Sequence, residues 1–155
     1  MDAEGPVTVL VYPVAPGGST HEYLLLRRVP SRGGFWQGVT GGVATDETLD
    51  EAALREFQEE TALTPSRLFP LGFSYTFVPK KAAASRGTPT QPVTEHVYLA
   101  LLEAKVDPTL DPAEHDAWDW FAYPEARVWL RWPENVEALR RCENFIARVL
   151  LGPRR

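Results

Sequence analysis

The sequence has 155 residues, of which 44% are hydrophobic and 24% are charged, with a mean hydropathy of −0.25. These values are typical of a globular protein and exclude a disordered, fibrous or membrane-embedded chain. We expect a single domain over residues 1–155, because about 150 residues form one core. One cysteine cannot form an internal disulfide, and the acidic first residues lack a secretion signal. We therefore expect a cytoplasmic location and no membrane contact.

The formal net charge is −5, from 21 acidic and 16 basic residues. The acidic excess is local: residues 46–60 contain seven acids and one arginine, and the remaining chain contains 14 acids and 15 lysines and arginines. A long nucleic-acid track is disfavoured, because such surfaces carry a basic surplus. A small phosphate-bearing substrate that arrives with its own Mg²⁺ is compatible with this distribution.

In the first half of the chain, residues 7–12 are β-branched and predict a strand. Residues 13–19 are rich in proline and glycine and predict a turn, followed by a second strand over residues 22–28. Residues 35–42 run from a loop into a short strand that ends at glycines. A helix is predicted over residues 49–61.

In the second half, apolar and aromatic residues predict strands over residues 68–78, 93–103 and 117–121. Residues 79–92 contain Lys80, Lys81 and Arg86 among prolines and predict a mobile basic loop. Apolar side chains at helical spacing predict a closing amphipathic helix over residues 133–151, with Cys142 on its buried face. This order of elements predicts an α+β fold, an α/β/α sandwich in which helices cover a mixed sheet.

The helix over residues 49–61 has its acidic side chains in an unusual place. At about 100° per residue, Glu56, Glu59 and Glu60 share one half of the helix with most of its apolar residues. An acidic face that is only solvated would lie on the other half. Glu56 and Glu60 also repel each other at i,i+4, at a cost of about 0.2–0.5 kcal/mol. A hard cation such as Mg²⁺ would offset that cost, although a solvated helix remains an equal alternative on these grounds alone.

The spacing of the charged residues resembles the signature of the Nudix hydrolases. The matching positions are Gly41, Glu47, the pair Arg55-Glu56 and the pair Glu59-Glu60. The departure is Ala62, where the family usually has glycine. Since that position follows the helix and holds no ligand, we expect a changed helix end and intact chemistry.

Residues outside this signature are similar to one branch of the family. They are the segment 35–41, Thr94-Glu95, Glu114-His115 and Trp120. This pattern resembles the branch that includes dihydroneopterin triphosphate pyrophosphatase, and the Glu-His-x-x-x-x-Trp part also resembles diadenosine polyphosphate hydrolases. The resemblance implies a mixed sheet between helices. It also implies Mg²⁺-dependent hydrolysis of a diphosphate linkage, with Mn²⁺ able to substitute.

The resemblance also implies roles for residues of the signature. The metal ligands would be Glu56, Glu59 and Glu60 with the carbonyl of Gly41. Glu59 or Glu60 would also orient the attacking water. The catalytic candidates are therefore Glu59 and Glu60, together with Arg55. Arg55 would brace Glu47, which precedes the helix cap, or Glu59.

Further candidates lie outside the signature. Glu114 would complete the site or act as the base, and Glu95 is the rival for that role. Arg27 and Thr40 occupy positions that contact substrate in relatives, and Trp36 offers a flat surface for a base or pterin ring. A solvated arginine, a strand threonine and a core tryptophan are the alternatives.

The leading hypothesis is a pyrophosphohydrolase that acts on a nucleotide or dihydroneopterin triphosphate and releases a monophosphate and pyrophosphate. The alternatives are a diadenosine polyphosphate or ADP-ribose hydrolase, a Nudix-fold nucleotide-binding module without catalysis, and an acidic helical interaction protein. The three histidines lack ligand spacing, so we expect no zinc site. The sequence leaves open the substrate, the base, the number of metals and the oligomeric state, for which a homodimer is one option.

Overall fold

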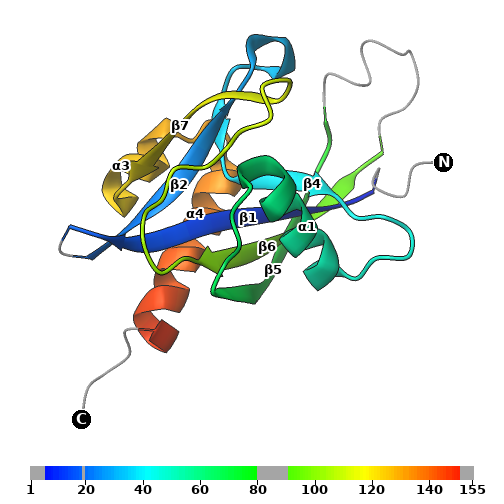
Figure 1. Cartoon of the computed structure of the whole chain (residues 1–155). Helices are drawn as coiled ribbons and strands as arrows, with labels where there is room; N and C mark the ends of the chain where they lie inside the picture. The colour runs from blue at the N-terminus through cyan, green and yellow to red at the C-terminus, as the bar shows by residue number, and fades with distance from the viewer. Residues whose placement is uncertain (1–5, 19, 80–90, 151–155) are drawn as a thin grey trace.

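The computed structural model describes residues 6–18, 20–79 and 91–150, and its main elements are drawn in Figure 1. The strands are β1 (Val7–Gly17), β2 (Thr20–Arg28), β3 (Trp36–Gln37), β4 (Val39–Gly42), β5 (Arg67–Phe77), β6 (Val93–Leu101) and β7 (His115–Phe121). The α-helices are α1 (Leu49–Thr61), α3 (Tyr123–Trp129) and α4 (Pro133–Phe145). A 3₁₀ turn covers Pro30–Arg32, and a π-helical turn covers Ile146–Leu150.

The strands form one mixed sheet. Its main path is β3-β2-β1-β6-β5, with β4 paired to β1 and β7 paired to β2. The pairing of β1 with β6 is parallel, and the other pairings between named strands are antiparallel. The predicted mixed sheet is therefore confirmed.

Helices lie on both faces of the sheet, as Figure 1 shows. Because side chains alternate along a strand, Val9 and Val11 of β1 pack with Phe57 of α1, and Leu10 and Tyr12 belong to a second cluster. That second cluster contains the buried residues of α3 and α4: Ala126, Ala138, Leu139 and Cys142. Burying each large apolar side chain contributes about 1.5–3 kcal/mol, so both layers are held by their own core. The α/β/α sandwich is confirmed.

The turn predicted over residues 13–19 is wrong in extent. Strand β1 continues through Pro13 and Pro16 to Gly17, and β2 begins at Thr20. The φ angle that the proline ring imposes is compatible with extended backbone, and Val14 and Ala15 are buried in the two different core clusters. The strand therefore absorbs both prolines. Gly18, with φ of 56°, supplies the left-handed turn residue.

The C-terminal region also differs from the prediction. Helix α3 was not expected, because seven residues that begin at a proline-containing turn show too little periodicity. Helix α4 ends at Phe145 and continues as the π-helical turn, where the expected helix ran to residue 151. Residue 151 and the predicted basic loop with Lys80, Lys81 and Arg86 lie outside the described residues.

Two other observations concern the whole described chain. No helix in residues 6–18, 20–79 or 91–150 is long and apolar enough to cross a membrane. The thiol of Cys142 is fully buried in α4, so its expected place in the core is confirmed. Burial raises the pKa of this thiol well above its ordinary value, which makes it unreactive in the folded state.

Candidate metal and phosphate site

The site begins where β4 meets α1. A Cβ atom at Gly41 would overlap the carboxyl group of Glu56, so only glycine allows this approach. Gly41 pairs with Val9 in the sheet, which fixes the strand, and the buried Ala52, Ala53 and Phe57 fix the helix. The backbone of β4 and the Glu56 carboxylate are thus held in contact by the fold itself.

Helix α1 begins and ends as its sequence indicates. Thr48 and Glu51 form a capping box: the Glu51 amide donates to the Thr48 hydroxyl, and the Thr48 amide donates to the Glu51 carboxylate. The helix ends at Ala62, which has a left-handed φ of 62° and whose amide donates to the Gln58 carbonyl. The expected change at this end is therefore a strained non-glycine cap.

Arg55 connects β4, the loop before the helix, and the acidic face of α1. Its guanidinium donates to both carboxylate oxygens of Glu47, at 2.6 and 2.9 Å, and to the Gly42 carbonyl at 2.8 Å. It also donates to Glu56 at 2.9 Å and to Glu59 at 3.3 Å. The hydrogen bonds from Arg55, and then that from the Ala44 amide, lower the pKa of Glu47 to about 2. These contacts support the bracing role expected of Arg55 and Glu47.

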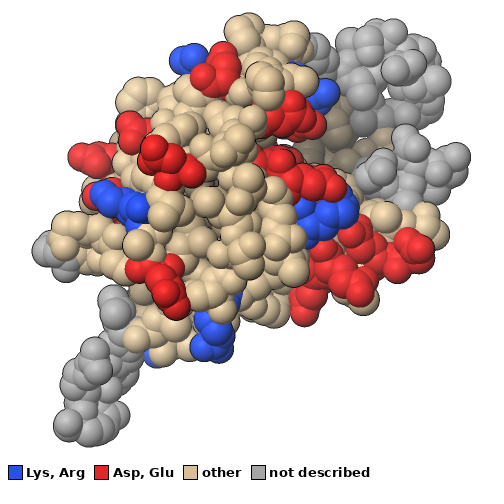
Figure 2. Space-filling model, in the orientation of Figure 1, with Lys and Arg blue, Asp and Glu red and all other residues tan. Residues whose placement is uncertain are grey.

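The three glutamates of α1 differ in exposure. The side chains of Glu60 and Glu56 are 8% and 13% exposed, whereas that of Glu59 is 59% exposed. Glu56 and Glu60 therefore point toward the body of the protein, and Glu59 lies at the rim. Figure 2 shows acidic side chains gathered over α1 and the segment before it.

Glu60 of α1 lies close to Glu114 and His115, at the start of β7. One ligand atom each from Glu60, Glu114 and His115 lie within 4.8 Å of one another. The Glu60 Oε1 atom and both ring nitrogens of His115 are buried and have no hydrogen-bond partner among the described residues. Unsatisfied buried polar atoms are costly, about 1–3 kcal/mol each, so this group fits a bound cation.

The electrostatics of the group support the same interpretation. Burial, followed by the nearby Glu56 and Glu114 carboxylates, raises the pKa of Glu60 to about 9. Burial also raises the pKa of Glu56, and burial followed by the Arg28 charge lowers the pKa of His115. Without a cation the group therefore favours a protonated carboxyl and a neutral imidazole, and a divalent cation would supply the missing positive charge.

Arg28, which the sequence did not single out, lies near these carboxylates. Between β2 and β7 the register shifts, so that Arg27 is opposite Ala117 and Arg28 is opposite His115. Arg28 is close enough to Glu60 and Glu114 for their charges to act on its pKa, although burial lowers that pKa overall. The side chain of Arg27 instead donates to Asp116 at 2.8 Å.

Trp36 and Thr40 have different neighbours. Trp36 packs edge to face against Phe121 and Trp129, with ring centroids 5.7 and 5.6 Å away, in the layer that contains α3. Thr40 immediately precedes Gly41 and accepts a hydrogen bond from Gln37 at 2.7 Å. Substrate contact by Arg27, Thr40 and Trp36 stays a prediction. Of the three, Thr40 is next in the chain to Gly41, which lies against the Glu56 carboxylate.

The rival acids Glu95 and Glu114 are separated by the sheet. Glu95 is 6% exposed and accepts hydrogen bonds from Thr8 and Tyr75, and Tyr75 in turn accepts one from Asn135 of α4. It therefore lies on the face that α4 covers. Glu114 is the acid that the structure brings to Glu60.

Sequence reasoning left Arg28 and His115 out of the site. Arg28 was missed because the register shift between β2 and β7 leaves no mark in the residue pattern. His115 was dismissed because no second histidine or cysteine lies at ligand spacing. Its adjacency to Glu114 was the available signal, since one chain segment delivers both side chains.

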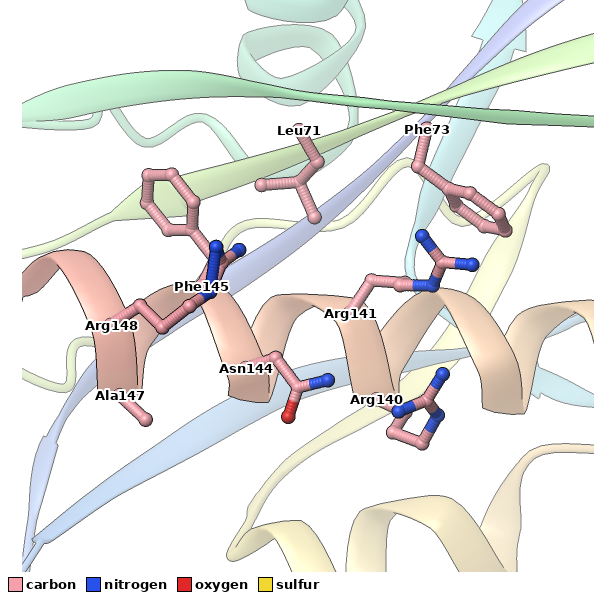
Figure 3. Close-up of a pocket in the computed structure, with 8 residues that line it drawn as sticks. All are labelled: Leu71, Phe73, Arg140, Arg141, Asn144, Phe145, Ala147 and Arg148. Atoms are coloured by element: carbon pink, nitrogen blue, oxygen red, sulfur yellow. The ribbon is translucent and has the colours of Figure 1, made fainter.

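A cleft of about 370 Å³ lies on the other side of the molecule, between β5 and α4. Figure 3 shows Arg140, Arg141 and Arg148 of the C-terminal helical segment beside Phe73 and Phe145, and the Arg141 guanidinium is 4.1 Å from the Phe73 ring centroid. Its lining contains no carboxylate, so this cleft is unsuited to the cation that the Glu60 group requires.

Two relatives share more than a third of their aligned residues with the chain. An octanoyltransferase of Myxococcus xanthus is 36% identical over 127 residues, which cover 81% of this chain and 34% of that protein. An RNA pyrophosphohydrolase of Stenotrophomonas maltophilia is 38% identical over 114 residues, which cover 66% of this chain and 54% of that protein. The chain thus spans about a third and about half of the lengths of these relatives.

A solved structure extends the comparison to nearly the whole fold. The dihydroneopterin triphosphate pyrophosphohydrolase of E. coli superposes with a TM-score of 0.77 at 25% identity, covering 91% of this chain and 97% of that one. The model of the NUDIX domain family matches residues 5–142. Together with the signature residues at β4 and α1, this match shows that the chain belongs to the Nudix family.

Proposed function

We propose that the chain is a metal-dependent pyrophosphohydrolase that cleaves a diphosphate linkage in a nucleotide or pterin triphosphate. The observation that carries the proposal is the inward pair Glu56 and Glu60. Glu56 lies against Gly41 and is bonded by Arg55, and a Glu60 oxygen is buried and has no partner among the described residues. An acidic helix that only faces solvent would leave those oxygens in water.

The residues fit Mg²⁺, which prefers a few carboxylates together with water and phosphate oxygens. When bound, Mg²⁺ polarises phosphoryl oxygens and lowers the pKa of a bound water. In this proposal Glu56 and Glu60 hold the metal with the Gly41 carbonyl, and Glu59 contributes from the rim. Glu114 takes the proton of the attacking water, because it lies beside Glu60.

Arg28 is assigned a phosphate contact, beside the substrate contact that the sequence suggested for Arg27. Its guanidinium is partly buried near Glu60 and Glu114, and among the described residues it donates to the Arg32 carbonyl at 3.2 Å. A partly buried arginine is suited to bind a phosphate bidentately. Thr40 remains a second candidate for substrate contact because it adjoins Gly41.

The substrate proposal follows the solved relative and the preceding sequence resemblance. Because the aligned relative from Stenotrophomonas is named for RNA, an RNA with a 5′-triphosphate belongs in the same test. The acidic surface over α1 favours the small substrate, because a polynucleotide would meet repulsion there.

The test is a substrate screen with Mg²⁺ and product identification. We expect a pterin or nucleoside triphosphate to yield a monophosphate and pyrophosphate. Glu60→Gln should lower kcat by at least about 100-fold, whereas the exposed control Glu103→Gln should leave it unchanged. Full turnover by Glu60→Gln would contradict the site assignment.

Product identity separates the alternatives. AMP with ATP would indicate a diadenosine polyphosphate hydrolase, and AMP with ribose phosphate an ADP-ribose hydrolase. Tight nucleotide binding without turnover under every divalent metal would indicate a binding module.

A single domain, a cytoplasmic location and a homodimer are further parts of the proposal. Light scattering of the purified chain tests the homodimer.

A further inference from the structure

The contact between Glu60 and His115 has an unusual length. The distance from Glu60 Oε1 to His115 Nε2 is 3.9 Å, which is too long for a hydrogen bond. Two ligands of one ion, each about 2.1 Å from it, lie at most about 4.2 Å apart. The gap between these two atoms therefore matches a shared cation.

The histidine has no other described function for its polar atoms. Its side chain is 0% exposed, and neither ring nitrogen has a hydrogen-bond partner among the described residues. A neutral ring of this kind can donate one nitrogen lone pair to a metal. Burial excludes bulk water as the partner of that nitrogen.

The backbone also holds the ring in place. The His115 amide donates to the Asp111 carbonyl at 3.0 Å, and the Val29 amide donates to the Glu114 carbonyl at 3.0 Å. Strand pairing then sets His115 opposite Arg28 at the register shift. Because these backbone hydrogen bonds and the strand pairing hold both adjacent residues, the side chains of Glu114 and His115 are placed together beside Glu60.

We propose that His115 Nε2 is a direct ligand of a divalent cation that it shares with Glu60, beside Glu114, forming a mixed nitrogen and oxygen position. The inference rests on the proposed metal-dependent function and names a ligand that the signature does not contain. Imidazole is a ligand of first-row transition metals, and Mn²⁺ belongs to that series while also binding carboxylate oxygens, whereas Mg²⁺ prefers oxygen ligands throughout. This position is thus expected to favour Mn²⁺ over Mg²⁺.

The decisive measurement is pulsed electron paramagnetic resonance of Mn²⁺ bound to the full chain without substrate. We expect a ¹⁴N coupling of a directly bound imidazole, and its loss in His115→Gln. His96→Gln is the matched control, since no described side-chain contact links His96 to the Glu60 group, and it should retain the coupling.

Calorimetric titrations with Mn²⁺ alone and Mg²⁺ alone give the second readout. His115→Gln should weaken Mn²⁺ binding by about 10–100-fold and Mg²⁺ binding by less than about threefold. An equal loss for both ions would indicate a structural role for His115 and overturn the proposal. Thermal melts without metal show whether the variant folds.

The wild-type spectrum decides the question even if the variant does not fold. Absence of ¹⁴N coupling in Mn²⁺-loaded wild-type protein would show that His115 does not bind the metal directly and would overturn the proposal. If such a protein still hydrolyses triphosphates, the proposed function survives and the His115 assignment fails. If the coupling is present and no substrate is cleaved, the His115 assignment survives and the proposed function fails.

Discussion

At the residue scale, Glu60 combines burial with two neighbouring acids. Its pKa rises from an ordinary 4.5 to about 9, so folding favours the protonated form. Protonation of Glu60 stabilises the folded state fully below pH 4.5, and this stabilisation is lost as the pH rises through 9. The metal-free protein should therefore lose stability across that window.

Glu60→Gln removes the ionisation and should remove most of that loss. With a chelator present, we expect the variant to exceed the wild type in free energy of unfolding by about 1–3 kcal/mol at the upper end of the window. Near pH 5 the two should be similar. Denaturant unfolding at both pH values measures the difference, and an equal decline in both proteins would contradict the buried-acid account.

Gly41 is a second residue with a sharp expectation. In Gly41→Ala the new methyl group must displace the Glu56 carboxylate, because that carboxylate is the flexible partner in the overlap. We expect metal affinity to fall by about 10–100-fold, while the melting temperature changes little. Titration with Mn²⁺ measures this affinity. Gly18→Ala is the control: it strains the backbone at a left-handed turn residue with open space around it, away from the Glu56 carboxylate, and should leave the Mn²⁺ affinity unchanged.

At the element scale, the C-terminal end of α1 is strained. Ala62 has φ of 62°, a conformation that costs a residue with a Cβ roughly 1 kcal/mol more than glycine. Ala62→Gly should therefore stabilise the protein by about 1 kcal/mol. The matched change Ala53→Gly, inside the same helix, should destabilise it by about 1 kcal/mol or more.

Denaturant midpoints of the two variants provide the measurement. Opposite signs would show that the helix end, and not the general loss of a methyl group, governs the effect. A destabilised Ala62→Gly would contradict the strained cap.

The element boundaries show which local signals were sufficient. Helix α1 agrees with its predicted range of residues 49–61, because the capping-box residues Thr48 and Glu51 mark its start in the sequence and Pro65, which disfavours helix at the residue before it, follows its end. The hairpin was not, because Pro13 and Pro16 are turn formers locally, whereas neighbouring strands hold them extended. Helix α3 was missed because its seven residues are stabilised by the second core cluster rather than by their own periodicity.

At the scale of the whole molecule, binding of a cation should stabilise the fold. A ligand at about 100 times its Kd adds about 2.7 kcal/mol, which corresponds to a rise of about 5–10 °C in Tm for a chain of this size. We expect saturating Mn²⁺ or Mg²⁺ to produce such a rise, and a chelator to reverse it. In Glu60→Gln the rise should be much smaller, and an equal rise in both proteins would place the cation elsewhere.

The sequence by itself determined the family resemblance, the mixed sandwich and the Gly41, Arg55, Glu56 and Glu60 frame, because these depend on spacing within one strand, loop and helix. Only the tertiary structure decided that Arg28 lies near the carboxylates and that His115 belongs with Glu60. It likewise separated Glu114 from Glu95 by a sheet. The reason is that strand register and the shift between β2 and β7 set which face each side chain occupies, and neither is written in local residue pattern.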